Sequence, residues 1–173
     1  MDLETRRLLP SDAEAYAHLR RVMLQHEPLA FLASPEDDIA SDASVVRERL
    51  SHEEDALFGA FIGPTLVGAV GVYRAKMLKA RHKIGVWGMF VVPEHRRAGA
   101  ARQLLTHAIE HARSLPGAIR LGLSVSETAD AALRLYQSLG FEIWGKEPCA
   151  VCHEGRCVSE YYMTLDLTAV PNE

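Results

Sequence analysis

The sequence lacks the features that mark membrane, secreted and nucleic-acid-binding proteins. No apolar run approaches the ~18 residues that a membrane-spanning helix needs. The first residues lack the basic and then apolar order of a signal peptide. The 19 Lys and Arg residues are outnumbered by 23 Asp and Glu, which gives a net charge of −4 and disfavours a general nucleic-acid binder. We therefore expect a cytoplasmic protein with no membrane or nucleic-acid partner.

Cysteine is scarce, and its placement argues against a secreted disulfide framework. The three cysteines all lie between Cys149 and Cys157, and an odd number so closely spaced does not form such a framework. Cys149, Cys152 and Cys157 could bind zinc together with His153, but their spacing is that of one short connection rather than two ligand pairs. We expect reduced thiols and no metal.

The chain also has no repeat and no linker rich in Gly, Pro or Ser. Its 173 residues, 48% of them hydrophobic, fit one domain over residues 1–173, because second cores usually appear beyond roughly 200–250 residues. Hydrophobic periodicity predicts the order β-α-α-β-β-β-α-β-α-β-β. This order indicates an α/β (α+β) fold, in which a mixed sheet carries helices on both faces.

Two stretches of this pattern bear on function. Residues 84–92 are a nearly continuous apolar run that stops at Pro93, which predicts a strand buried on both faces. The preceding loop, residues 75–83, is rich in Lys, Arg and His, and we expect it to be solvated, with attraction of an acidic substrate or of phosphates as the alternative.

The last two strands are expected at residues 141–145 and 159–167, joined by the segment that holds the cysteines.

The sharpest local feature lies where this apolar strand ends and the next helix begins. A helix start leaves backbone N–H groups without partners and carries partial positive charge. Small residues let an anion approach the main chain there, and arginines add cationic donors, so the segment predicts a phosphate cradle. The alternative is a basic surface turn before an Ala-rich helix. The cradle residues are Arg96, Arg97, Ala98, Gly99, Ala100, Ala101 and Arg102.

Two motifs give the chain a family resemblance. The first is Arg96-x-x-Gly99-x-Ala101, preceded by Val91-Val92-Pro93, and the second is the run Leu-Tyr-x-x-x-Gly-Phe at residues 135–141. In this order and at this separation they resemble the GNAT superfamily of acetyl-CoA-dependent N-acyltransferases, over essentially the whole chain. The resemblance implies a mostly antiparallel central sheet with one splayed pair of strands.

The resemblance also implies roles for particular residues. The backbone of Met89, Phe90 and Val91 would pair with the pantetheine arm of acetyl-CoA and stabilise the developing oxyanion. The pyrophosphate would sit on the main chain of residues 97–102. Tyr136 would protonate the departing thiolate, although a tyrosine at this position could equally be a core residue.

The sequence departs from the family pattern at two places. Ala129 stands where the family often has an asparagine that helps to hold the cofactor arm. Residues 84–92 contain no carboxylate, whereas many members carry a glutamate general base on this strand. The base therefore stays open among candidates elsewhere in the chain, which are His26, Glu27, His82, Glu160, Tyr161 and Tyr162.

These observations predict an N-acetyltransferase that moves an acetyl group from acetyl-CoA to a primary amine by direct attack in a ternary complex. The acceptor is expected to be a small-molecule amine first and a protein amino group second, and a homodimer is left open. The alternative is a non-catalytic acyl-CoA-binding or regulatory domain of the same fold.

Overall fold

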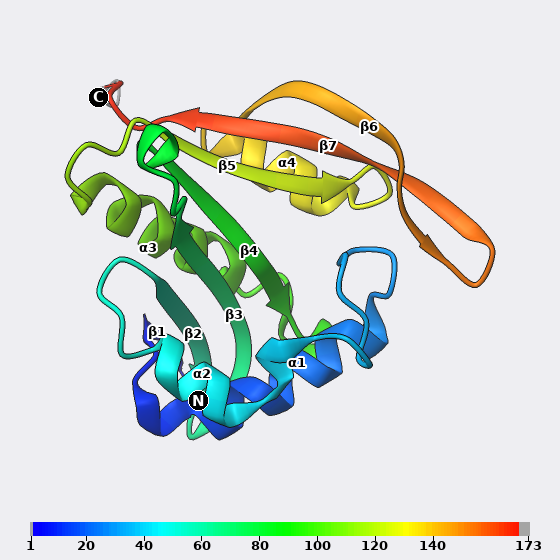
Figure 1. Ribbon diagram of the computed structural model, residues 1–173. Coiled ribbons are helices and arrows are strands. Elements are labelled where there is room, and N and C mark those ends of the chain that lie inside the picture. The colour runs from blue at the N-terminus through cyan, green and yellow to red at the C-terminus, as the bar shows by residue number, and fades with distance from the viewer. Residues whose placement is uncertain (1, 170–173) are drawn as a thin grey trace.

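Strands from the whole length of the chain join one seven-stranded sheet in the computed structural model, which describes residues 2–169 (Figure 1). The strand order is β1-β2-β3-β4-β5-β7-β6, and every neighbouring pair is antiparallel except β4 and β5. The predicted fold class and element order are confirmed. The strands are β1 (Leu3–Arg7), β2 (Ala56–Ile62), β3 (Thr65–Arg74), β4 (Lys83–Val91), β5 (Arg120–Ser126), β6 (Glu142–His153) and β7 (Arg156–Asp166).

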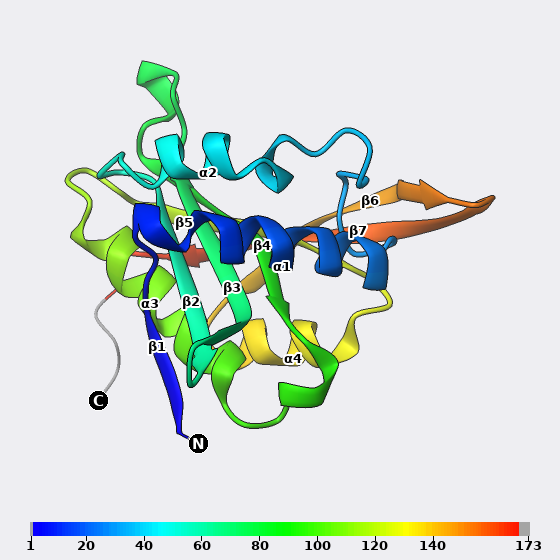
Figure 2. The ribbon, with the colours of Figure 1, turned by 90° about the horizontal axis from the view of Figure 1, so that it is seen from below.

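Helices cover both faces of this sheet and bury two separate cores (Figure 2). Side chains alternate along each strand, so Leu57 of β2 joins the core with Tyr16 of α1, while Phe58 joins the core with Leu104 of α3. None of the described helices is long and apolar enough to cross a membrane. The helices are α1 (Ala13–His26), α2 (Ala43–Arg49), α3 (Ala100–Ser114) and α4 (Asp130–Ser138), with short 3-10 turns η1 (Pro10–Asp12), η2 (Ile39–Ser41), η3 (Leu78–Ala80) and η4 (Pro93–His95).

The central parallel pair, β4 and β5, separates soon after it forms (Figure 1). Pairing runs only from Lys83 opposite Arg120 to Gly85 opposite Gly122, although β4 stays paired with β3 along its other edge. The splayed pair implied by the family resemblance is therefore present. It leaves one edge of β4 without a strand partner for most of its length.

A bulge in β4 lies within this unpaired stretch. The register with β3 shifts between Ala69 and Gly71, and Gly88 has a φ of +60°, a backbone conformation that favours glycine. The prediction that residues 84–92 are buried on both faces is wrong for the middle of the strand. Val86, Trp87 and Met89 are only partly buried, because β5 has turned away and a cavity opens beside them.

The second motif forms the C-terminal turn of α4. The N–H of Phe141 donates to the carbonyl of Tyr136 at 3.1 Å, and the N–H of Gly140 donates to that of Gln137 at 3.0 Å. Gly140 has a φ of +91°, and the rings of Tyr136 and Phe141 meet edge to face at 5.9 Å. This is a Schellman turn with its usual apolar contact. The Gly-Phe pair of the motif thus fixes the position of the tyrosine.

The final hairpin is much longer than predicted. β6 and β7 pair from Glu142 opposite Thr164 out to His153 opposite Arg156, so most of the expected connection is strand. The hairpin closes through Glu154 and Gly155, whose φ angles are +47° and +78°. Such a pair of positive φ angles matches the right-handed twist of a two-residue hairpin.

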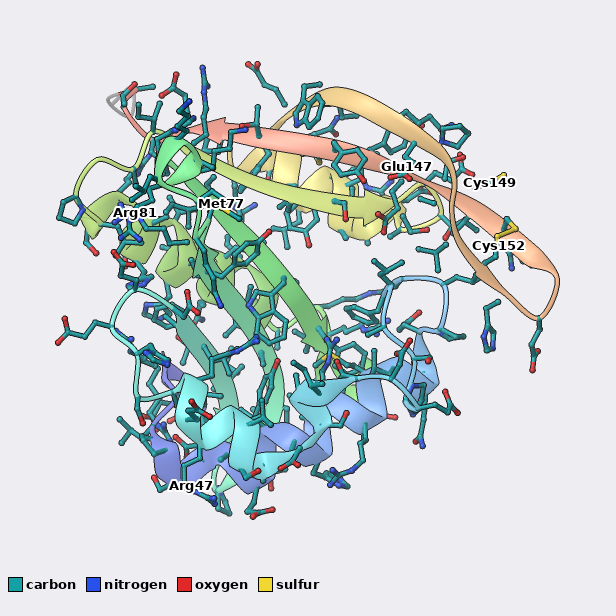
Figure 3. The ribbon with its side chains drawn as sticks, viewed as in Figure 1. Arg47, Met77, Arg81, Glu147, Cys149 and Cys152 are labelled. Carbon is teal, nitrogen blue, oxygen red and sulfur yellow. A yellow bond between two sulfur atoms is a disulfide. The ribbon has the colours of Figure 1, made fainter. Side chains whose placement is uncertain are left out.

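The expectation of reduced thiols is wrong for two of the three cysteines. Cys152 and Cys157 lie directly opposite each other in this hairpin and form a disulfide (Figure 3). The sequence assigned their segment to an irregular connection, which hid this cross-strand register. Cys149 is free and exposed.

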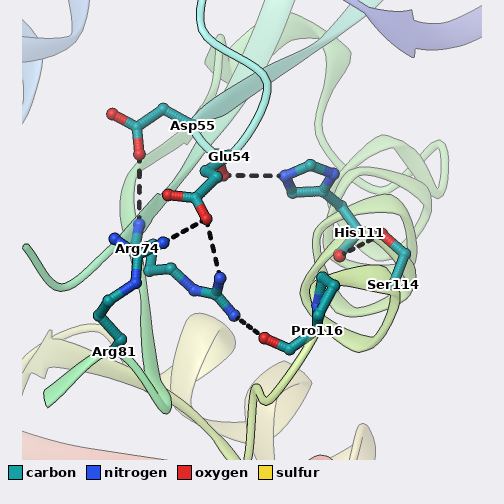
Figure 4. Close-up of polar contacts among 7 residues, drawn as sticks. All are labelled: Glu54, Asp55, Arg74, Arg81, His111, Ser114 and Pro116. Carbon is teal, nitrogen blue, oxygen red and sulfur yellow. Dashed lines mark hydrogen bonds and ion pairs between the residues drawn. The ribbon is translucent and has the colours of Figure 1, made fainter. Parts of the chain in front are cut away.

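A charged cluster anchors the β3–β4 loop at the N-terminal end of β4 (Figure 4). Glu54 accepts hydrogen bonds from Arg74, at 2.8 Å, and from Arg81. Arg74 also donates to the carbonyl of Pro116, and the ring Nε2 of His111 lies 3.1 Å from the carbonyl of Glu54. The loop is therefore held at the end of β4 opposite to Pro93. That position excludes it from binding phosphates at the start of α3.

We expect His111 to make the folded state less stable in mild acid. Burial lowers the pKa of its ring below the ordinary 6.5. Above that value the ring is neutral in both states, whereas below it the unfolded chain takes up the proton more readily than the folded one. The free energy of unfolding should therefore fall as the pH drops below about 6.5.

Urea unfolding at about pH 7.5 and about pH 5.5 measures this effect. The variant His111→Gln keeps a hydrogen-bond donor but does not titrate, so it should weaken the pH dependence. The control His18→Gln replaces an exposed histidine of α1 and should leave it unchanged. Equal pH dependence in His111→Gln and wild type would contradict the prediction.

Candidate active site

A cavity of about 610 Å³ occupies the gap between the splayed strands. It reaches both faces of the sheet, since its wall includes Tyr136 of α4 and Arg20 of α1. The connection between α1 and α2 closes one side with residues 30–33 and Asp37. The strand residues in the wall are Val86, Trp87, Gly88 and Met89 of β4, Leu123, Ser124, Val125 and Ser126 of β5, and Glu160 and Tyr162 of β7.

The predicted cradle lies where β4 leads through η4 into α3. None of the backbone N–H groups of residues 97–102 donates to a backbone carbonyl, and the first to do so is that of Gln103, which bonds to Gly99 at 3.1 Å. Gly99 has a φ of +86°, and a Cβ at this position would make only an ordinary contact, 3.9 Å from Nε2 of Gln103. A run of unpartnered donors at the start of a helix suits an anion.

The three arginines of the cradle differ in what holds them. Arg96 donates to the carbonyl of Val91 at 2.8 Å and to Glu27 at 2.8 Å. Arg102 donates to Ser138 of α4, also at 2.8 Å. Among the described residues Arg97 has no side-chain partner, and its φ of +67° is unusual for a residue with a Cβ. Two of the arginines therefore brace the segment, and Arg97 is free to meet a ligand.

Tyr136 combines burial with access to the cavity. Only 5% of its surface is exposed, yet it lines the cavity wall. Burial raises the pKa of its hydroxyl to about 12. Within residues 2–169 the hydroxyl has no hydrogen-bond partner, so its proton is available to a group in the cavity.

The remaining predicted residues are divided between the cavity and the cores. Met89 and Ala129 line the cavity, whereas the side chains of Phe90 and Val91 are buried in the cores. The N–H of Val92 donates to Val67 of β3, and N–H directions alternate along a strand. The N–H of Val91 therefore points to the open edge of β4, and that of Phe90 points to β3.

The structure brings two of the six base candidates to the cavity. Glu160 and Tyr162 are in its wall. The other candidates are exposed, engaged elsewhere or on the other face: His26 is exposed, Glu27 binds Arg96, His82 precedes β4, and Tyr161 packs against the core beneath α3 and α4.

Sequence reasoning missed the α1 side of the cavity. Arg20 and Asp38 form an ion pair at 3.0 Å, and each side chain is only 6% exposed. Tyr16, one turn earlier in α1, is buried, and its hydroxyl has no hydrogen-bond partner in the described part of the chain. Its ring meets Trp87 edge to face. An arginine on the apolar side of a helix was the available signal, but the partner, Asp38, could not be read from local sequence.

A second hollow lies beyond Trp87, and three of its charged residues already hold one another. Its volume is about 830 Å³, and its wall includes Glu54, Arg74 and Arg81, which hold one another as described above. Among residues 2–169 no group of three or more His, Cys, Asp or Glu side chains could hold a metal ion.

A mixed sheet that opens between two central strands, with a tyrosine and a helix start with unpartnered N–H groups beside the opening, is the arrangement that the resemblance to an acyltransferase implies. The chain belongs to the Acetyltransferase (GNAT) family, whose model matches residues 18–141. This confirms the resemblance drawn from the two motifs. None of the curated proteins matches the chain in sequence.

Solved structures agree with this assignment. The chain is similar to a GNAT-family acetyltransferase from Streptococcus pneumoniae, at 25% identity and a TM-score of 0.82, with 95% of this chain and 99% of that chain covered. It is also similar to a phosphinothricin acetyltransferase from Sinorhizobium meliloti in complex with acetyl-CoA, at 15% identity and a TM-score of 0.83, with 96% of this chain and 89% of that chain covered. A ribosomal-protein-alanine N-acetyltransferase from Brucella melitensis matches at 21% identity and a TM-score of 0.80, with 94% of this chain and 99% of that chain covered.

We expect Asp38→Asn to lower the free energy of unfolding by about 3–5 kcal/mol, because it leaves the buried guanidinium of Arg20 without its counter-charge. The matched control is Glu14→Gln, which breaks an exposed pair with Arg47 at 3.6 Å and should cost less than about 1 kcal/mol. Urea unfolding measures both. Similar losses in the two variants would contradict the importance of the buried pair.

Proposed function

We propose that this protein transfers the acetyl group of acetyl-CoA to a primary amine by direct attack in a ternary complex. The observation that carries the proposal is the cavity beside the open edge of β4, whose wall includes Tyr136 on one face of the sheet and Arg20 on the other. A donor and an acceptor can therefore enter from opposite faces and meet beside β4.

The cradle fits the donor's pyrophosphate. Backbone N–H groups of residues 97–102 would bind its oxygens, with Arg97 and Arg102 adding positive charge. Gly99 leaves space for close approach of the phosphate, since it has no side chain of its own and the nearest atom to a Cβ there would be Nε2 of Gln103 at 3.9 Å. Ala129 lines the path of the pantetheine arm but supplies only a methyl group. When bound, acetyl-CoA supplies an acetyl group activated as a thioester.

The open edge of β4 would hold the reacting end of the donor. Met89 lines the cavity beside the bulge, and Val91 points its N–H to the same edge, whereas Phe90 braces the strand against β3. Fixed N–H donors of this kind stabilise a developing oxyanion by about 3–4 kcal/mol each. Because they belong to a strand held by β3, they need no reorganisation during the reaction.

Tyr136 would act as the acid. Its high pKa keeps the hydroxyl protonated throughout the physiological range, so the proton is in place when the thiolate leaves. The Schellman turn and the ring of Phe141 hold the tyrosine in the wall. Its lack of another hydrogen-bond partner supports this role over a purely structural one.

The acceptor is a small-molecule amine in our first proposal and a protein amino group in our second. The similar structures include one named for the small molecule phosphinothricin and one named for a ribosomal-protein alanine. The cavity volume of about 610 Å³ must hold the end of the pantetheine arm as well as the amine. That shared space favours a small acceptor.

We expect Gly99→Asp to weaken acetyl-CoA binding by at least about tenfold, or 1.4 kcal/mol, because it places a negative charge in the cradle. Aspartate is a good N-cap and tolerates positive φ, so the fold should survive. The control Gly117→Asp adds the same charge at a φ of +73° in open space. Calorimetric titration measures the dissociation constants, and equal affinities for Gly99→Asp and wild type would contradict the cradle.

We expect Tyr136→Phe to lower kcat by about 10²–10⁴-fold while the acetyl-CoA dissociation constant stays unchanged, because the ring still packs on Phe141 but the proton is gone. Tyr73→Phe, at an exposed site on β3, is the control. Release of free thiol measures kcat. Full turnover by Tyr136→Phe would show that Tyr136 is only a core residue.

A further inference from the structure

Glu160 is a buried carboxylate that nothing in the described fold neutralises. It lies on β7 with only 9% of its surface exposed, and its side chain lines the cavity. Among residues 2–169 it forms no ion pair and no side-chain hydrogen bond. Buried polar groups are normally satisfied, and a buried charge without a partner is costly. Such a group at a cavity wall points to a ligand that supplies the missing partner.

Strand register places Glu160 on the face of the sheet opposite to Tyr136. Glu160 pairs with Ser126 and Tyr162 pairs with Ser124, and residues two apart on a strand share a face. Tyr161 and Met163 alternate with them and join the core that contains Tyr136. Glu160 and Tyr162 therefore face the α1 side, where the acceptor enters in the proposed function.

The neighbouring charges leave Glu160 as the free carboxylate of this side. Arg20 is neutralised by Asp38. Asp37 accepts hydrogen bonds from the backbone and side chain of Ser34. Arg20 and Asp37, the charged residues that this side contributes to the cavity wall, are therefore engaged with partners other than Glu160.

The hairpin groups around Glu160 are engaged as well. The hydroxyl of Tyr162 donates to Glu147, which lies opposite Glu160 across the hairpin. Lys146, the cation beside Glu147, pairs with Glu127 at 2.8 Å. The cation nearest to Glu160 along the hairpin is therefore already engaged.

We propose that Glu160 is the catalytic base: its carboxylate binds the acceptor's ammonium group and removes the proton that blocks attack. The inference rests on the proposed function and names the class of acceptor. Trp87 and Phe31 also line the cavity, and aromatic faces attract cations. The acceptor is thus a primary amine that arrives as an ammonium ion on a small apolar stem.

The protons and electrons of the step balance. Glu160 takes one proton from the ammonium, which frees the nitrogen lone pair. The nitrogen bonds to the acetyl carbon as the C–S bond breaks, and the electron pair of that bond leaves on sulfur, which takes the phenolic proton of Tyr136. The nitrogen's second proton passes through solvent to the Tyr136 phenolate, and Glu160 releases its proton to solvent. The products are an amide, a thiol and one proton.

The first test is Glu160→Gln, which keeps the shape and removes the charge. With 2-phenylethylamine or 1,4-diaminobutane at about pH 7.5, kcat/KM should fall about 10²–10⁴-fold, the usual range for loss of a general base. With hydroxylamine, which is neutral at this pH, the loss should be about tenfold or less. In the pH profile of kcat/KM for Glu160→Gln, the acid-side limb should also move toward the pKa of the amine. The variant Glu160→Asp, which keeps a carboxylate, should retain more of the wild-type rate than Glu160→Gln.

A second measurement does not depend on turnover. Without donor, the two ammonium probes should raise the melting temperature of the wild type and not that of Glu160→Gln. The control is Glu147→Gln, which removes a carboxylate directly across the hairpin but outside the cavity wall. It should behave as wild type in both experiments.

The outcomes separate the two hypotheses. No rise in melting temperature with any probe, an equal rise in Glu160→Gln, or a loss of rate shared by Glu147→Gln would overturn the assignment of Glu160. A wild-type protein that does not bind acetyl-CoA would instead overturn the proposed function. Retained acetyl-CoA binding by Glu160→Gln, together with the selective loss for ammonium acceptors, supports both.

Discussion

The early end of pairing between β4 and β5 is the constraint on which the rest of the structure depends. The two strands share only the register from Lys83 to Gly85, so the following backbone of β4 has a free edge. Unpaired backbone groups in a protein interior need partners, and the proposed function gives this edge one in the bound donor. The cavity, the direction of the Val91 N–H toward the open edge and the partial exposure of Trp87 all follow from this one separation.

The opening also lets the two faces of the sheet carry different electrostatics. On the α3 and α4 side, unpartnered N–H groups and Arg97 suit an anion, and Tyr136 stays neutral. On the α1 side, Asp38 cancels the charge of Arg20, and Glu160 is left as a carboxylate that suits a cation. In the proposed function, a protein with a net charge of −4 would bind an anionic donor on one face of the sheet and a cationic acceptor on the other, because the two charged regions lie on opposite faces.

Features set by local sequence were predictable, and those set by long-range register were not. The order of the elements follows from periodicity, and the cradle and Tyr136 follow from short motifs whose geometry is that of one helix start and one Schellman turn. The buried pair of Arg20 and Asp38, the extent of the last hairpin and its disulfide all depend on which residues face each other in space. The sequence could name Glu160 only as one of six candidates, since burial and strand face decide among them.

The position of Glu160 explains how β4 can lack a carboxylate. Trp87 occupies the cavity side of β4, with the guanidinium of Arg20 at 5.5 Å and that of Arg49 at 5.0 Å from its ring. A carboxylate at this place would be drawn into an ion pair with Arg49, and a paired carboxylate is a weak base because the cation stabilises its charged form. β7 lies across the cavity, where Lys146 is already held by Glu127. A base on β7 thus keeps its charge for the ammonium, while the aromatic ring on β4 offers that ammonium a face without competing for the proton.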